Sequence, residues 1–155
     1  MTSPPWNARS EGHVAAQMLL LTGIAGLPLL RPAPRASSPL RATGTVLLVA
    51  GSVLAGWSAL RLGPNLTPLP EPRRDGQLVQ TGPYALVRHP VYGGLLLGSA
   101  GWALRRGHGG ALGLSLLLAL LFEHKSRDEE ARLMARFPDY PSYRRRVRKF
   151  IPWLY

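Results

Sequence analysis

Two short polar groups interrupt an otherwise apolar pattern and carry residue types suited to ligand chemistry. The first is the pair Arg88-His89 at the start of an apolar stretch, and the second is the run from Arg127 to Glu130 that follows the next one. Ionisable side chains at the edge of a hydrophobic segment are costly unless they have partners. We therefore expect the two groups to meet at one membrane surface and to enclose a charged small molecule.

His89 is the strongest single candidate for a functional side chain. Tyr84 and Tyr92 flank it, and Pro83 and Pro90 restrict the backbone around it. Tyr92 follows three residues later, so we expect it on the same helical face as His89. The alternative is a histidine that caps a helix or lies at the membrane interface without binding a ligand.

The acidic pair Glu129-Glu130 cannot point both carboxylates at one ligand, because neighbouring residues on a helix diverge by about 100°. One glutamate could bind the ligand while the other orients Arg88 or Arg127. The alternative is a solvated helix face among basic neighbours. A metal site is not expected, because the other histidines show no ligand spacing with His89 and the chain has no cysteine.

Hydrophobic residues make up 46% of the 155-residue chain and gather in four blocks, at 14–30, 42–62, 91–104 and 110–122. The second is long enough to span a bilayer, since about 20 helical residues cover about 30 Å. The last two are too short for upright spans, so they predict a tight helical hairpin that either extends into its flanks or dips into the membrane. The fold expected is an all-α integral membrane bundle of about four hydrophobic helices with amphipathic C-terminal helices.

The positive charge is distributed as in a multi-pass membrane protein. Of the 19 Lys and Arg residues, thirteen fall on the face that would carry both termini and five on the other, with Arg61 at the boundary. The positive-inside bias then predicts cytoplasmic termini and a cytoplasmic site in a plasma or inner membrane. The net charge of +11 also suggests nucleic-acid binding. We do not expect it, because the basic residues flank apolar blocks.

The segments around the apolar blocks supply the remaining expectations. Prolines throughout 63–83 exclude a continuous helix there and indicate a binding loop. Small residues four apart, such as Gly51 with Ala55 and Gly94 with Gly98, predict closely packed helices. We expect one domain in which 14–62 forms two N-terminal helices and 63–155 forms the catalytic core.

One bipartite pattern is specific. Thr81-Gly-Pro-Tyr-x-x-Val-Arg-His-Pro-x-Tyr-x-Gly94 resembles the signature of the isoprenylcysteine carboxyl methyltransferases and the related phospholipid methyltransferases. Glu129-Glu130-x-x-Leu133, followed by Phe137, Tyr140, Tyr143, Val147 and Phe150-Ile-Pro152, is similar to the second half of that pattern. The resemblance implies an integral membrane enzyme that uses S-adenosylmethionine and releases S-adenosylhomocysteine.

The resemblance also assigns roles to residues. Those implied to bind the cofactor are Gln77, Leu78, Val79, Tyr84, Arg88, His89, Pro90, Val91, Tyr92, Glu129 and Glu130. Those implied to act in catalysis are His89, Arg127 and Glu130, with Lys125 as the alternative to Arg127 for the basic role.

The expected reaction is methyl transfer to a lipophilic or membrane-delivered acceptor, such as an isoprenylcysteine-like carboxylate, a phospholipid amine or a small thiol. Two other functions remain open at this point. One is an NADPH-dependent membrane reductase of the sterol reductase type, which shares a similar C-terminal pattern. The other is a non-enzymatic membrane scaffold.

Overall fold

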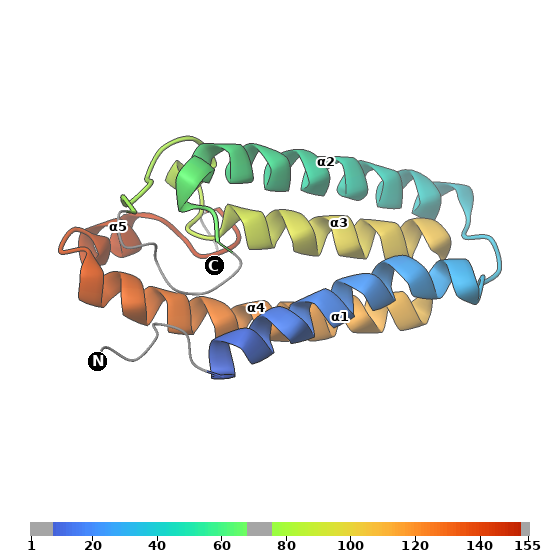
Figure 1. Ribbon diagram of the computed structural model, residues 1–155. Coiled ribbons are helices and arrows are strands. Elements are labelled where there is room, and N and C mark those ends of the chain that lie inside the picture. Colours follow the sequence, from blue (N-terminus) through green and yellow to red (C-terminus); the bar gives the residue numbers. More distant parts are fainter. Residues whose placement is uncertain (1–7, 68–75, 153–155) are drawn as a thin grey trace.

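The computed structural model describes residues 8–67 and 76–152, and in these residues the chain is a helical bundle (Figure 1). The elements are α1 (Ala8–Leu30), α2 (Ser38–Leu62), α3 (Pro90–Arg106), α4 (Gly109–Arg136) and α5 (Tyr140–Arg146), with short 3-10 turns η1 (Gly63–Asn65) and η2 (Gly82–Ala85). The all-α bundle predicted from the apolar blocks is confirmed. The middle of the proline-rich loop lies outside the described residues.

Local sequence signals determine where the helices begin and end. Pro39 and Pro90 lie in the first turns of α2 and α3, where the missing N–H costs nothing. Gly107 closes α3 in the left-handed conformation at φ 62°. The next residue, His108, caps α4 by accepting the N–H of Ala111 on Nδ1. The α3–α4 hairpin therefore turns within two residues, as predicted.

Two helix starts differ from the expectation, and the hairpin follows one of its two predicted forms. Helix α1 begins at Ala8, within the polar segment before the first apolar block, and α2 begins at Ser38, inside the predicted loop. The hairpin extends into its flanks, because α4 continues from its apolar half into the polar tail as one helix of 28 residues. At about 1.5 Å per residue this helix is about 42 Å long, so its polar half extends past the apolar zone.

The four long helices pack side by side, with α3 between α2 and α4, and with α1 against α4 and α3 (Figure 1). Helices α2 and α3 touch at their backbones. A Cβ on Gly51 would lie 2.4 Å from the backbone nitrogen of Gly98, and one on Gly101 would lie 2.4 Å from that of Leu48. The predicted close approach through small residues is confirmed for this pair.

The outer surface of the bundle is apolar along its length. Large hydrophobic side chains on all four helices are exposed, including Leu19, Val46, Leu97 and Leu120. Residues 11–30 and 38–65 are long and apolar enough to cross a bilayer, yet only 22% and 11% of their most apolar windows are buried. The core helix of a soluble protein would be mostly buried, so these surfaces fit contact with lipid.

Candidate functional site

The two halves of the bipartite pattern are joined by backbone pairing at one end of the bundle. Val87 forms a parallel bridge with Arg148 of the C-terminal tail. The N–H of Arg88 donates to the carbonyl of Arg148 at 2.8 Å, and that of His89 donates to the carbonyl of Lys149 at 3.1 Å. The tail thus runs alongside the segment that precedes α3 and fixes where its polar side chains point.

Arg88 connects α3, α4 and the tail. Its Nε donates to Oε1 of Glu130 at 2.9 Å, and its Nη1 donates to the carbonyls of Arg144, at 3.2 Å, and Val147. Its side chain is 10% exposed and that of Glu130 is 5% exposed. A buried ion pair of this kind is strongly destabilised when one partner is removed. Arg88 and Glu130 therefore hold the tail in place.

His89 lies between the two glutamates. Its Nε2 is 3.1 Å from Oε1 of Glu130, and its Nδ1 is 3.7 Å from Oε2 of Glu129. The ring stacks on that of Tyr92, with centroids 5.5 Å apart and planes 2° from parallel. The expected shared face of His89 and Tyr92 is confirmed. Since carboxylates only accept hydrogen bonds, Nε2 is the donor to Glu130.

The two glutamates have separate environments, as their divergence on the helix predicts. Glu129 accepts a hydrogen bond from the Tyr92 hydroxyl at 3.1 Å and lines a pocket. Glu130 instead receives Arg88 and His89 on one oxygen and Arg144, at 3.2 Å, on the other. Both oxygens of Glu130 are thus engaged by the protein, which leaves Glu129 as the acidic group that faces the pocket.

The pKa of Glu130 is lowered by its hydrogen-bond partners. Burial alone would raise it, but hydrogen bonds from His89 and Arg88 and their charges lower it from 4.5 to about 2. Glu130 is therefore ionised at neutral pH. An ionised carboxylate held by two guanidinium groups and an imidazole N–H is suited to positioning and unsuited to proton transfer.

Most of the residues predicted to bind the cofactor line one pocket beside Glu129. Those that line it are Gln77, Leu78, Val79, Tyr84, Arg88, His89, Val91, Tyr92 and Glu129. Pro90 and Glu130 do not line it: Pro90 lies in the first turn of α3, and Glu130 is directed toward Arg88 and His89. The pocket is bounded by the end of α2, the segment from Gly76, the start of α3 and the polar half of α4.

The two residues considered for the basic role, Arg127 and Lys125, lie in different environments. Arg127, predicted to act in catalysis, has a 70% exposed side chain, lies outside the pocket lining and pairs with Glu123 at 2.8 Å. Lys125 is the buried cation: its amine lies 5.4 Å from the centre of the Tyr92 ring and donates to Gln17 of α1 at 2.7 Å. Burial lowers the Lys125 pKa, and the charge of Glu129 opposes this effect.

Buried tyrosines connect the remaining walls of the pocket. The Tyr143 hydroxyl donates to the carbonyl of Tyr84 at 2.6 Å, and the Tyr84 hydroxyl donates to the carbonyl of Ser58 in α2 at 3.4 Å. Burial raises the pKa of Tyr84, Tyr140 and Tyr143 well above the usual value. These phenols stay protonated: Tyr84 and Tyr143 act as donors, and Tyr140 contributes an aromatic wall.

Half of the residues that line the pocket were not among the predicted site residues. The additional residues are Leu62, Asn65, Leu66, Thr67, Gly76, Leu133, Phe137, Tyr140 and Tyr143. Leu133, Phe137, Tyr140 and Tyr143 belong to the second half of the bipartite pattern, so that pattern could have indicated them. The residues near η1 belong to no sequence motif that could have indicated them. Among them Asn65 accepts the backbone N–H of Gln77 at 3.2 Å and so holds the loop edge.

Comparison with solved structures gives the class of fold. The chain is similar to a eukaryotic intramembrane Ras methyltransferase, an isoprenylcysteine carboxyl methyltransferase, with a TM-score of 0.71 and 26% sequence identity. The match covers 97% of this chain and 55% of that one. The fold and the site thus define a helical membrane protein with a pocket formed at the helix ends.

The sequence matches the phospholipid methyltransferase family over residues 40–137. The chain belongs to this family. It is also similar to the cobalt-zinc-cadmium resistance protein CzcN of Cupriavidus metallidurans, with 37% identity. A second relative is the nickel-cobalt-cadmium resistance protein NccN of Alcaligenes xylosoxydans xylosoxydans, with 36% identity. Each match covers 83 residues, or 53% of this chain. Those matches span 38% and 39% of the two relatives, so this chain matches well under half of their length.

Proposed function

We propose that the protein is an S-adenosylmethionine-dependent methyltransferase that acts on a lipophilic or membrane-delivered acceptor. The observation that carries the proposal is the placement of Glu129 beside the paired rings of His89 and Tyr92 in one pocket. Membership in the phospholipid methyltransferase family and likeness to an intramembrane methyltransferase support it.

The residues of the pocket fit the charges of this cofactor. Its ammonium and sulfonium groups are cationic. Glu129 is a carboxylate that faces the pocket, where it accepts the Tyr92 hydroxyl and lies 3.7 Å from Nδ1 of His89, whereas the guanidinium groups of Arg88 and Arg144 pair with Glu130. The aromatic ring of Tyr84, which lines the pocket, suits a sulfonium. Arg88 and His89 line the same wall and suit the cofactor's carboxylate.

When bound, the cofactor supplies an electrophilic methyl group. Transfer from a sulfonium is a one-step displacement, so the protein must chiefly position the reactants and exclude water. An acceptor carboxylate or thiolate is already nucleophilic and needs no base. For an amine acceptor, Glu129 is the pocket carboxylate in a position to accept the proton.

The acceptor would reach the pocket from the membrane side. Leu62 and Leu66 line the pocket where α2 ends, and Leu66 is 47% exposed. An exposed apolar rim suits a lipid-borne acceptor more than a charged soluble one. We further propose that this end of the bundle faces the cytoplasm, because it carries most of the Lys and Arg residues.

Ligand binding to the detergent-purified protein tests the assignment. Isothermal titration should show saturable binding of S-adenosylhomocysteine and none of NADPH, with the first abolished or weakened at least tenfold in Glu129→Gln. Binding of NADPH alone would establish the reductase alternative. Absence of both ligands from the wild-type protein, together with an intact helical spectrum, would favour a scaffold.

A further inference from the structure

A second cluster of ligating side chains lies outside the pocket, where α1 meets the polar half of α4. It consists of His13, His124 and Asp128, and one ligating atom from each lies within 4.8 Å of the others. His13 is buried, His124 is exposed and Asp128 is half-buried. No metal site was expected from the sequence, because the other histidines show no ligand spacing with His89 and because His13 and His124 lie far apart in the chain.

The cluster combines two features of a metal site. His124 and Asp128 are four residues apart on α4, so they share a helical face, and His13 approaches that face from α1. The His13 and His124 ring centroids are 5.2 Å apart with an interplanar angle of 79°. Two imidazoles on one tetrahedral ion hold their ring centres about 5 Å apart, so the rings are already at a suitable separation.

Small rotations of the three side chains would bring their ligand atoms to coordination distance from one ion. Ligands at about 2.0–2.2 Å in a tetrahedral zinc site lie about 3.3 Å from one another. The present limit of 4.8 Å is within reach of side-chain torsions, and the exposed His124 is free to turn. The neighbouring cations point to other partners: Lys125 donates to Gln17 and Arg127 to Glu123.

We propose that His13, His124 and Asp128 bind one divalent transition-metal ion, of the zinc or cobalt class. Two imidazoles with one carboxylate suit these ions and disfavour magnesium or calcium, which prefer oxygen ligands. Three protein ligands leave a coordination position for water. The ion would link the N-terminal part of α1 to α4, next to the Lys125–Gln17 hydrogen bond, and so hold the buried amine over Tyr92.

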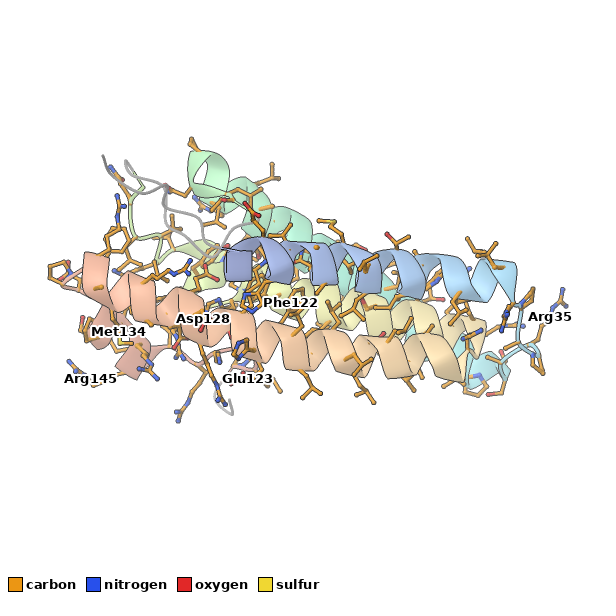
Figure 2. The ribbon with its side chains drawn as sticks, turned by 60° about the horizontal axis from the view of Figure 1, so that its bottom comes forward. Arg35, Phe122, Glu123, Asp128, Met134 and Arg145 are labelled. Carbon is orange, nitrogen blue, oxygen red and sulfur yellow. The ribbon has the colours of Figure 1, made fainter. Side chains whose placement is uncertain are left out.

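Cobalt binding gives a direct readout. The full chain, purified in detergent without a polyhistidine tag, is titrated with CoCl₂ and followed by visible absorption. The wild type should bind one equivalent with the intense d–d bands of a low-coordinate site, and ZnCl₂ should displace it. His124→Ala and Asp128→Asn should each weaken binding at least tenfold. His124 is exposed and Asp128 lies half-buried on α4 (Figure 2), so these variants should fold, and circular dichroism checks that they do.

Glu11→Gln is the matched control, because Glu11 is an exposed carboxylate on α1 near His13 in sequence but outside the cluster. It should bind cobalt like the wild type. Unchanged affinity in the His124→Ala, Asp128→Asn double variant, or no saturable binding to the wild type, would overturn the proposal. So would displacement of cobalt by saturating S-adenosylhomocysteine, because the ion would then lie at His89 and Glu129. Retained cobalt binding under saturating S-adenosylhomocysteine places the site apart from the pocket.

Discussion

Nε2 of His89 and Oε1 of Glu130 lie 3.1 Å apart, although 41 residues separate them in the sequence. The same glutamate oxygen accepts the Arg88 guanidinium at 2.9 Å. This contact divides the acidic pair into a positioning residue, Glu130, and a residue that faces the pocket, Glu129. The two neighbouring glutamates should therefore respond differently to the same substitution.

Replacement of each glutamate by glutamine should separate these roles. Glu130→Gln removes the charge that holds Arg88, His89 and Arg144, and breaking a buried pair costs about 3–5 kcal/mol. A marked fall in Tm is expected. Glu129→Gln should leave the Tm nearly unchanged and weaken S-adenosylhomocysteine binding by about 10- to 150-fold, the cost of a charge-assisted hydrogen bond. Equal effects of both variants on Tm and on binding would contradict the division.

The depressed pKa of Glu130 predicts a specific acid dependence. Its folded-state value of about 2 lies below the unfolded value of 4.5, so its stabilisation is complete above pH 4.5 and is lost as pH falls toward 2. Thermal unfolding followed by circular dichroism from pH 6 to pH 2 should show this loss. The stability of Glu130→Gln should depend less on pH across that window, and a profile parallel to the wild type would count against the pairing.

Substitutions of Lys125 and Arg127, both in α4, should have different effects on stability. Arg127→Ala removes an exposed side chain and should leave both ligand affinity and Tm within the range of ordinary surface changes, about ±0.5 kcal/mol. Lys125→Ala removes a buried amine from Tyr92 and Gln17 and should lower the Tm. Titration calorimetry and thermal unfolding of both variants check this. Loss of binding in Arg127→Ala alone would restore the catalytic role first expected for that residue.

Sequence patterns predicted the helices well and the direction of individual side chains less well. Apolar blocks and the prolines of 63–83 and at 90 indicate where helices lie or stop, because they act through local hydrophobicity and backbone geometry. Whether Lys125 or Arg127 faces inward depends on how α1 packs against α4, which no local pattern contains. The same holds for His13 and His124, which lie on different helices far apart in the sequence.

Backbone contact between α2 and α3 predicts that a residue larger than glycine is not tolerated at the contact positions. Gly51→Ala would place a Cβ 2.4 Å from the backbone of Gly98, whereas a Cβ on Gly56 has nothing within 4 Å. Overpacking typically costs about 1–3 kcal/mol, so Gly51→Ala should lower the Tm while Gly56→Ala, on the same helix, should not. Similar melting temperatures for both variants would show that the helices do not approach so closely.

Reporter fusions can test the proposed orientation. The unequal distribution of Lys and Arg predicts that a fusion after Tyr155 reports the cytoplasm and one at Ser37, between α1 and α2, reports the opposite side. Alkaline phosphatase and green fluorescent protein give complementary signals at each position. A non-cytoplasmic signal from the Tyr155 fusion would place the pocket on the wrong face.

The partners of Arg88 have a consequence for biosynthesis. Its guanidinium is satisfied by groups that lie 42, 56 and 59 residues later in the chain. During translation, Arg88 is therefore made before any of these three partners. The pocket can take its final form only once α4 and α5 have been synthesised, so the growing chain cannot bind a ligand there before its last helix is complete.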